Sequence, residues 1–220
     1  MSATARTLLF AALAMTLLTT APEATATATA QPPVLLIHGI KDDARKMEPL
    51  ARYLRSHGRT VHTMNLKPSW GQVGLEELAG QLEEFVRQTF PAHERFDLVG
   101  FSMGGLVSRY YLQRLGGMER VHRFVTISTP HRGTVMAFLI PNEGCRQMRP
   151  GSAFLRDLDR DADTLQRVGF TSLWTPLDLT IVPADSSVVA GAANRRLWCI
   201  AHPLMVYQPS CHEAVRVALE

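Results

Sequence analysis

Short segments rich in apolar residues alternate along this chain with stretches of helical spacing. Unbroken runs of about four to eight apolar residues, bounded by glycine or polar residues, are typical of strands buried on both faces of a sheet. Residues 33–38 form such a run and predict a buried strand, and segments in which apolar and polar residues mix predict further strands at 60–66, 96–99, 121–128, 170–174 and 196–201. Apolar residues spaced by three and four predict helices at 46–57, 75–90, 103–115 and 211–219, with partly helical structure at 153–168.

Alternation of strands and helices along the chain predicts an α/β fold. Strands joined through helices pair in parallel, and the helices then cover both faces of the sheet. We therefore expect a mostly parallel sheet of about six strands in a single domain at residues 31–220. The sequence shows no internal repeat, and residues 141–151 are expected to form a loop within this domain.

Residues 1–30 follow a different pattern. One arginine, Arg6, precedes an apolar run at residues 8–18, and alternating alanine and threonine follow at residues 24–30. The run suits the hydrophobic region of a signal peptide but is too short to cross a bilayer about 30 Å thick. We therefore expect residues 1–30 to be a signal peptide, which predicts a secreted or periplasmic protein.

Composition and charge narrow the choice of partners. The 220 residues are 46% hydrophobic and carry a formal net charge of +3, which suits a globular domain. No run or stripe of basic residues accompanies this small excess, so we expect no nucleic-acid partner. No apolar stretch after residue 30 is long enough for a transmembrane segment.

The sequence indicates neither a metal site nor a cofactor. It has no HExxH motif and no paired CxxC motifs, which disfavours a zinc enzyme. An acidic stretch at residues 157–163 resembles the start of a calcium loop. It lacks the turn glycine and the distal glutamate of such a loop, so we interpret it as an exposed acidic helix face. Cys145, Cys199 and Cys211 predict one disulfide and one free thiol in an exported protein, with the pairing left open.

A candidate nucleophile lies where a predicted strand gives way to a predicted helix. Residues 100–104 read Gly-Phe-Ser-Met-Gly and match the pattern G-x-S-x-G. In this context the serine occupies a sharp, strained turn, and glycines two positions away on either side leave room for the chain to fold back. The pattern therefore predicts Ser102 as a nucleophile at the end of a strand.

A serine nucleophile needs a base, and the base needs an acid to orient it. In a strand–turn–helix context of this kind the chain order is serine, acid, histidine. His202 follows the last predicted strand in a loop and is the favoured base, with His212 in the final helix as the fallback. Asp178 follows the strand at 170–174 and is the favoured acid, with Asp185 as the alternative.

The negative charge that develops on the substrate carbonyl needs two backbone N–H donors. One donor is expected from Met103, directly after the nucleophile, and the other from Ile40 in the loop after the first strand. Gly39 would let that loop turn so that the Ile40 N–H faces the site.

These motifs together resemble those of bacterial α/β-hydrolase lipases, in particular the small, lidless, secreted ones. The resemblance covers nearly the whole of residues 31–220 and rests on residues 33–40, 100–105, 128–134, 170–178 and 201–205. This sequence differs from those lipases at Phe101, where they often have histidine, and at Pro203, where they often have glycine.

The resemblance implies a minimal α/β-hydrolase that acts as a carboxylic ester hydrolase, either a triacylglycerol lipase or a carboxylesterase. It implies Ser102 as nucleophile, Asp178 as acid and His202 as base, with Ile40 and Met103 as oxyanion donors and no cofactor. We expect a monomer that acts on ester or lipid substrates and makes transient contact with lipid interfaces.

Two other functions remain open. The same triad could act on a thioester, amide, polyester or phospholipid, or the fold could serve as a catalytically inactive binding module. Apolar residues 135–140 are expected to form either a rim for acyl chains or ordinary core beneath a loop.

Overall fold

The computed structural model describes residues 31–220, so the expected signal peptide at residues 1–30 lies outside the described residues. Six strands form one sheet in the order β2-β1-β3-β4-β5-β6, and every neighbouring pair is parallel. The strands are β1 (Val34–Ile37), β2 (Val61–Met64), β3 (Phe96–Phe101), β4 (Val121–Ile127), β5 (Phe170–Trp174) and β6 (Ala193–Arg196). The predicted parallel sheet of about six strands is therefore confirmed.

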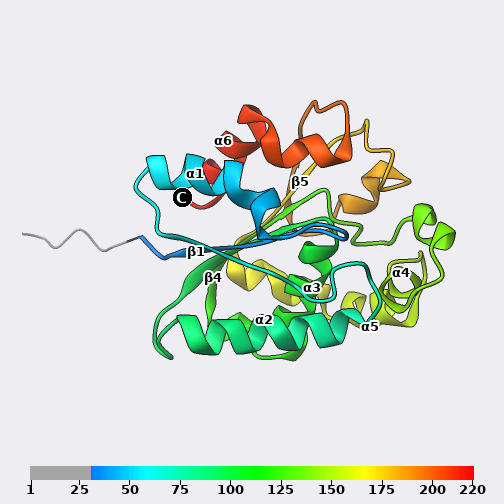
Figure 1. Cartoon of the computed structure of the whole chain (residues 1–220), viewed down its shortest axis with the longest axis horizontal. Helices are drawn as coiled ribbons and strands as arrows, with labels where there is room; N and C mark the ends of the chain where they lie inside the picture. The colour runs from blue at the N-terminus through cyan, green and yellow to red at the C-terminus, as the bar shows by residue number, and fades with distance from the viewer. Residues whose placement is uncertain (1–30) are drawn as a thin grey trace, which may run out of the picture. The chain divides into compact units, whose positions relative to one another are not determined.

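Helices cover both faces of the sheet (Figure 1). Helices α1 (Glu48–Ser56) and α6 (Pro209–Ala218) lie on one face. Helices α2 (Leu75–Thr89), α3 (Met103–Arg114) and α5 (Ala153–Asp159) lie on the other. Side chains alternate between the faces along each strand. In β1, Leu36 accordingly packs in the cluster with α1 and α6, whereas Leu35 packs in the cluster with α2 and α3.

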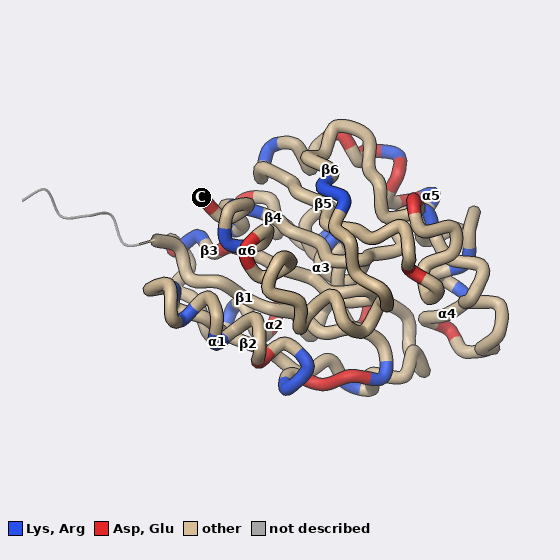
Figure 2. Tube along the Cα trace, turned by 90° about the horizontal axis from the view of Figure 1, so that it is seen from above, with Lys and Arg blue, Asp and Glu red and all other residues tan. Residues whose placement is uncertain are grey.

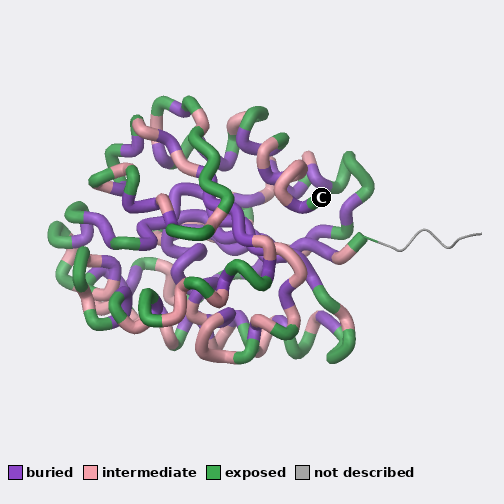
Figure 3. The backbone as a smooth tube through the Cα atoms, turned by 180° about the vertical axis from the view of Figure 1, so that it is seen from behind, coloured by how far each residue is buried: buried purple, intermediate pink, exposed green. Residues whose placement is uncertain are grey.

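The central strands are shielded on both faces, as Figure 3 shows in purple. Every residue of β1 and of β3 is buried, which explains why both strands are apolar or glycine except at Asp97, whose buried carboxylate pairs with Arg59. Lys and Arg are interspersed with Asp and Glu around the outside of the domain (Figure 2). Within residues 31–220, no helix has the length and apolar character needed to cross a bilayer.

The last strand lies three residues earlier than the sequence predicts. The expectation of a strand at 196–201 rested on the apolar residues that follow Arg196. It is instead Ala193–Arg196 that pairs with β5, and all four residues are exposed at the edge of the sheet. A strand at an exposed edge of the sheet needs no apolar run. The apolar residues Trp198 and Ile200 lie after this strand and are 65% and 77% exposed.

The partly helical structure expected at 153–168 is present, whereas the loop expected at 141–151 needs correction. The expected helical stretch at 153–168 divides into α5 and a 3₁₀ helix at Ala162–Val168. The expected loop at 141–151 contains a short helix, α4 (Glu143–Gln147), which begins where Asn142 accepts a hydrogen bond from the Cys145 N–H. A helix of five residues is too short to show a periodic pattern.

The expected disulfide is also absent, because all three cysteines are buried free thiols. Cys145 packs in the cluster beneath α2 and α3, whereas Cys199 and Cys211 pack on the opposite face of the sheet. Cys145 therefore has no cysteine partner on its own face. The Cys199 Sγ–H donates to the Ala201 carbonyl, and burial raises the pKa of the Cys211 thiol to about 12.

The strand order sets the position of the functional site. Strand β1 is flanked by β2 on one side and by β3 on the other, and the two connections run over opposite faces of the sheet. In parallel sheets, a crevice forms outside the carboxyl ends of the strands at such a reversal. Ile37 of β1 is in register with Gly100 of β3, so both strands end at this crevice.

Candidate active site

Ser102 lies where β3 ends and α3 begins, in a backbone conformation that few residues adopt. Its φ is 54° and its ψ is −124°, which is strained for a residue with a side chain. The neighbouring glycines make this turn possible, because a Cβ on Gly104 would collide with the His38 carbonyl oxygen and one on Gly100 would lie 2.6 Å from the Cα of Gly105. The turn places the Ser102 hydroxyl beside the N-terminus of α3.

Ser102, His202 and Asp178 form one chain of hydrogen bonds. The Nδ1–H of His202 donates to Asp178 Oδ2 at 2.8 Å, which leaves Nε2 to accept from the Ser102 hydroxyl at 3.0 Å. The three residues follow β3, β5 and β6 and are between 4% and 7% exposed. This arrangement lets the imidazole take a proton from the serine hydroxyl while the carboxylate fixes its tautomer.

Asp178 is held in its ionised form by several donors. Its Oδ1 accepts the backbone N–H groups of Thr180 at 2.9 Å and Ile181 at 2.8 Å. Burial by itself would raise the pKa of Asp178, but the hydrogen bond and charge of His202, together with these amides, bring the pKa below its usual range. The carboxylate therefore stays charged at neutral pH.

The two alternative residues lie apart from this chain of hydrogen bonds. Asp185 sits in the 3₁₀ helix η5 (Ala184–Ser187), where its exposed carboxylate pairs with Arg132 at 3.2 Å. The Nε2–H of His212 donates to the Val206 carbonyl at 2.8 Å, so this histidine closes a turn before α6. Neither contacts Ser102.

The loop after β1 brings Ile40 next to Ser102. Gly39 permits this approach, because a Cβ there would lie 3.0 Å from the Cβ of Ser102. His38 anchors the loop: its Nδ1–H donates to the Gly39 carbonyl at 2.8 Å and its Nε2 accepts the Leu66 N–H at 3.0 Å. Within residues 31–220, the amides of Ile40 and Met103 donate to no backbone carbonyl outside regular helices and strands.

A cavity of about 270 Å³ opens beside Ser102. Thr180, Ile181 and Pro130 form part of its wall, and the residues expected as either rim or core supply much of the rest. Leu139 is 72% exposed, whereas Ala137 is buried in the core, so residues 135–140 serve both purposes. The apolar lining comprises Ile40, Met136, Ala137, Leu139, Ile140, Cys145, Met148 and Ile181.

Sequence reasoning missed two groups that support the site. The Phe101 ring packs on the His202 ring, with centroids 4.9 Å apart at 33°. The Thr129 hydroxyl donates to the Ser102 carbonyl at 3.0 Å and so fixes the strained turn from the end of β4. The sequence marked Phe101 as the neighbour of Ser102 that differs from the lipases, and Thr129 as part of the similar segment 128–134, but it did not show either contact.

The acidic stretch at 157–163 differs from the solvated face that the sequence predicts. Asp157 and Asp161 both pair with Arg114 of α3, at 2.8 and 2.9 Å, and Asp159 pairs with the fully buried Arg109 at 2.8 Å. These ion pairs fasten α5 to α3. Among residues 31–220, no group of histidine, cysteine and acidic side chains has the arrangement of a metal site.

Comparison with known proteins assigns the chain to a family. The model of the family described as palmitoyl protein thioesterase matches residues 33–158. A triacylglycerol lipase of Pseudarthrobacter phenanthrenivorans is 33% identical over 114 residues, which cover 48% of this chain and 35% of that protein. Palmitoyl-protein thioesterase 3 of Dictyostelium discoideum is 29% identical over 106 residues, which cover 46% of this chain and 36% of that protein. The chain thus spans about a third of the length of the curated relatives it matches.

Solved structures show the same fold. A lipase of Bacillus licheniformis in its mature form aligns with a TM-score of 0.71 at 17% identity, covering 87% of this chain and 93% of that one. Lipase B of Aspergillus fumigatus aligns with a TM-score of 0.69 at 18% identity, covering 83% of this chain and 51% of that one. The predicted α/β-hydrolase fold is therefore confirmed.

Proposed function

Because the chain belongs to the palmitoyl protein thioesterase family, we propose that it is a serine hydrolase that cleaves carboxylic esters of lipids. The observation that carries this proposal is the hydrogen-bonded chain from Ser102 through His202 to Asp178. An inactive binding module would not need to keep a strained serine in contact with a buried imidazole, because that strain costs free energy.

The reaction proceeds by acyl transfer. His202 Nε2 takes the proton of the Ser102 hydroxyl as Oγ attacks the substrate carbonyl, and Asp178 stabilises the imidazolium. The amides of Ile40 and Met103 donate to the oxyanion of the tetrahedral intermediate. His202 then gives this proton to the leaving group. In the second half of the reaction His202 takes a proton from water as the water attacks the acyl-enzyme, and it returns that proton to Ser102 Oγ as the acid is released.

The apolar cavity beside Ser102 supports an aliphatic acyl group. Its volume of about 270 Å³ and its mostly apolar lining suit part of a hydrocarbon chain, and the remainder would extend over the exposed Leu139. A thioester of the same acyl chain is the second candidate substrate, because the matching family is described as a thioesterase. We place the acyl chain in this cavity in both cases.

The test is hydrolysis of octanoyl esters and thioesters by the protein and its Ser102→Ala variant. We expect the variant to lose about 10⁶-fold in kcat, as when the nucleophile of a triad is removed. Ser56→Ala, which removes an exposed hydroxyl at the end of α1, should keep full activity. If Ser102→Ala and the unmodified protein hydrolyse both substrates equally, the proposal is wrong.

A further inference from the structure

A second cleft, polar in character, lies beside the reacting groups. Its volume is about 500 Å³, and it opens between the loop after β1 and the 3₁₀ helix η6 (His202–Tyr207). Lys41, Lys46, Ser69, Trp70 and Tyr207 line it together with acidic and basic residues of the same loop. Lys41 also lines the apolar cavity that contains Ser102, so the two spaces adjoin at this residue.

Packing contacts place this cleft on the His202 side of Ser102. The Lys46 ammonium lies 4.9 Å from the ring centroid of Tyr207 and 5.9 Å from that of Phe101. Phe101 in turn stacks on His202, and Tyr207 ends the 3₁₀ helix that His202 begins. The cleft therefore lies on the side of Ser102 from which His202 approaches.

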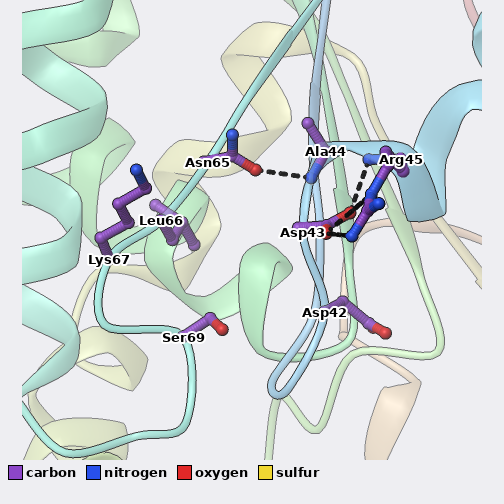
Figure 4. Close-up of a pocket in the computed structure, with 8 residues that line it drawn as sticks. All are labelled: Asp42, Asp43, Ala44, Arg45, Asn65, Leu66, Lys67 and Ser69. Carbon is purple, nitrogen blue, oxygen red and sulfur yellow. Dashed lines mark hydrogen bonds and ion pairs between the residues drawn. The ribbon is translucent and has the colours of Figure 1, made fainter.

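The cleft has an excess of positive charge. Figure 4 shows a neighbouring pocket that shares Asp43 and Arg45 with this cleft. There Arg45 folds back onto Asp43 and neutralises it, and Asn65 accepts a hydrogen bond from the Ala44 N–H at 2.7 Å. This leaves Lys41 and Lys46 against the single half-buried carboxylate of Asp42. Within residues 31–220, neither lysine forms an ion pair, and Lys41 lies 5.2 Å over the Trp70 ring.

We propose that this cleft holds the leaving group of the substrate and favours an alcohol or thiol that carries a carboxylate or phosphate. The inference rests on the proposed function. A tetrahedral intermediate on Ser102 has three other substituents: the oxyanion faces the amides of Ile40 and Met103, and the acyl chain occupies the apolar cavity. The remaining substituent is the leaving group.

Collapse of the tetrahedral intermediate requires the leaving group to lie on the His202 side of Ser102. The bond from the carbonyl carbon to the leaving oxygen or sulfur breaks, its electron pair stays on the leaving atom, and the proton comes from His202 Nε2. The leaving atom must therefore lie within hydrogen-bond reach of His202, and the rest of its group extends towards Lys46 and Tyr207. A triacylglycerol would place a second apolar body here, against two lysines.

The test compares two octanoyl esters that differ only in charge. Their leaving phenols are 3-(4-hydroxyphenyl)propionate and the corresponding propionamide, in which the charge is too remote to alter the phenol as a leaving group. We expect kcat/KM to be about threefold to fivefold higher for the carboxylate, the size of a solvent-accessible charge pair. The preference should fall as salt is added.

Lysine variants show whether the cleft causes the preference. Lys46→Met keeps the aliphatic stem and should bring the ratio of the two kcat/KM values towards one, whereas Lys46→Arg should preserve it. Arg52→Met removes an exposed cation on α1 outside the cleft and should leave the ratio unchanged. Equal kcat/KM for both esters in the unmodified protein, or an unchanged ratio in Lys46→Met, overturns the inference alone. Failure to hydrolyse either ester in a Ser102-dependent way overturns the proposed function and this inference with it.

Discussion

Ser102 reaches the imidazole only because neighbouring residues hold its backbone in a strained turn. The Thr129 hydroxyl donates a hydrogen bond to the Ser102 carbonyl, although it takes no part in the proposed reaction. The Ser102 N–H donates to the Ile127 carbonyl at 2.9 Å. Both contacts come from β4 and the residues just after it. Contacts with the next strand of the sheet therefore hold Ser102 in its strained conformation and keep its side chain in place.

The two aspartates proposed from the sequence can be separated by matched substitutions. Asp178→Asn leaves the shape of the site unchanged but removes the charge that fixes the His202 tautomer, so we expect a loss of about 10⁴-fold in kcat at neutral pH. Asp185→Asn affects only an exposed pair with Arg132 and should keep kcat within about twofold. Steady-state kinetics on a soluble ester distinguishes them. Comparable losses in both variants would contradict the assignment of Asp178.

Asp178 also makes stability depend on pH in a defined direction. Its pKa in the folded protein is below its usual value of about 3.9, so ionisation favours the folded state. This contribution is present above about pH 4 and is lost as the pH falls through the lowered pKa. Urea unfolding of the protein and of Asp178→Asn from pH 7 to pH 2 should show that the difference in unfolding free energy narrows below about pH 4. A difference that widens in acid would refute this explanation.

At the scale of elements, α3 and the end of β4 approach so closely that only glycine fits between them. A Cβ on Gly105 would overlap the Thr129 side chain, which would have to move and release the Ser102 carbonyl. We expect Gly105→Ala to lower the free energy of unfolding by about 1–3 kcal/mol. It should also lower kcat on a soluble ester.

Gly80 of α2 is the matched control. A Cβ there meets no atom within 4 Å, and helical alanine is favoured over glycine. Gly80→Ala should therefore raise the free energy of unfolding by about 0.5–1 kcal/mol without changing kcat. Urea denaturation measures both variants. If they shift stability in the same direction, close packing is not the reason for Gly105.

The helices and strands differ in how clearly the sequence predicts them. Strands β1 and β3 were predictable because both faces are buried and every position except Asp97 is apolar or glycine. Strand β6 was misplaced because it lies at an exposed edge, where Asn194 and Arg195 carry no apolar pattern. Proximity of Ser102, Asp178 and His202 could be expected from the chain order, since all three follow parallel strands. The contact of Arg109 with Asp159 could not, because it depends on how α5 packs against α3.

At the scale of the whole molecule, exposed apolar side chains surround the same end of the sheet as the reacting groups. Leu179 follows Asp178 and is 80% exposed, while Ile200 precedes His202 by two residues and is 77% exposed. Phe138, Leu139 and Trp198 are also exposed in segments that follow β4 and β6. In Figure 1 the strands point towards these segments. Exposed apolar side chains that gather at one end of a domain are typical of an interaction surface, and they support the proposed contact with lipid.

Substitutions at Leu179 and Ile200 can test binding to a lipid surface separately from ester hydrolysis, because neither residue lines the apolar cavity. The double variant Leu179→Ser and Ile200→Ser removes two large apolar groups whose burial in lipid would contribute about 1.5–3 kcal/mol each. We therefore expect at least about a tenfold weaker binding to phosphatidylcholine vesicles and slower hydrolysis of an emulsified long-chain ester. The kcat/KM for a soluble short-chain ester should remain within about twofold, because Ser102, His202 and Asp178 keep their contacts. Equal losses on both substrates would assign these residues to the active site itself, whereas unchanged vesicle binding would show that lipid docks elsewhere.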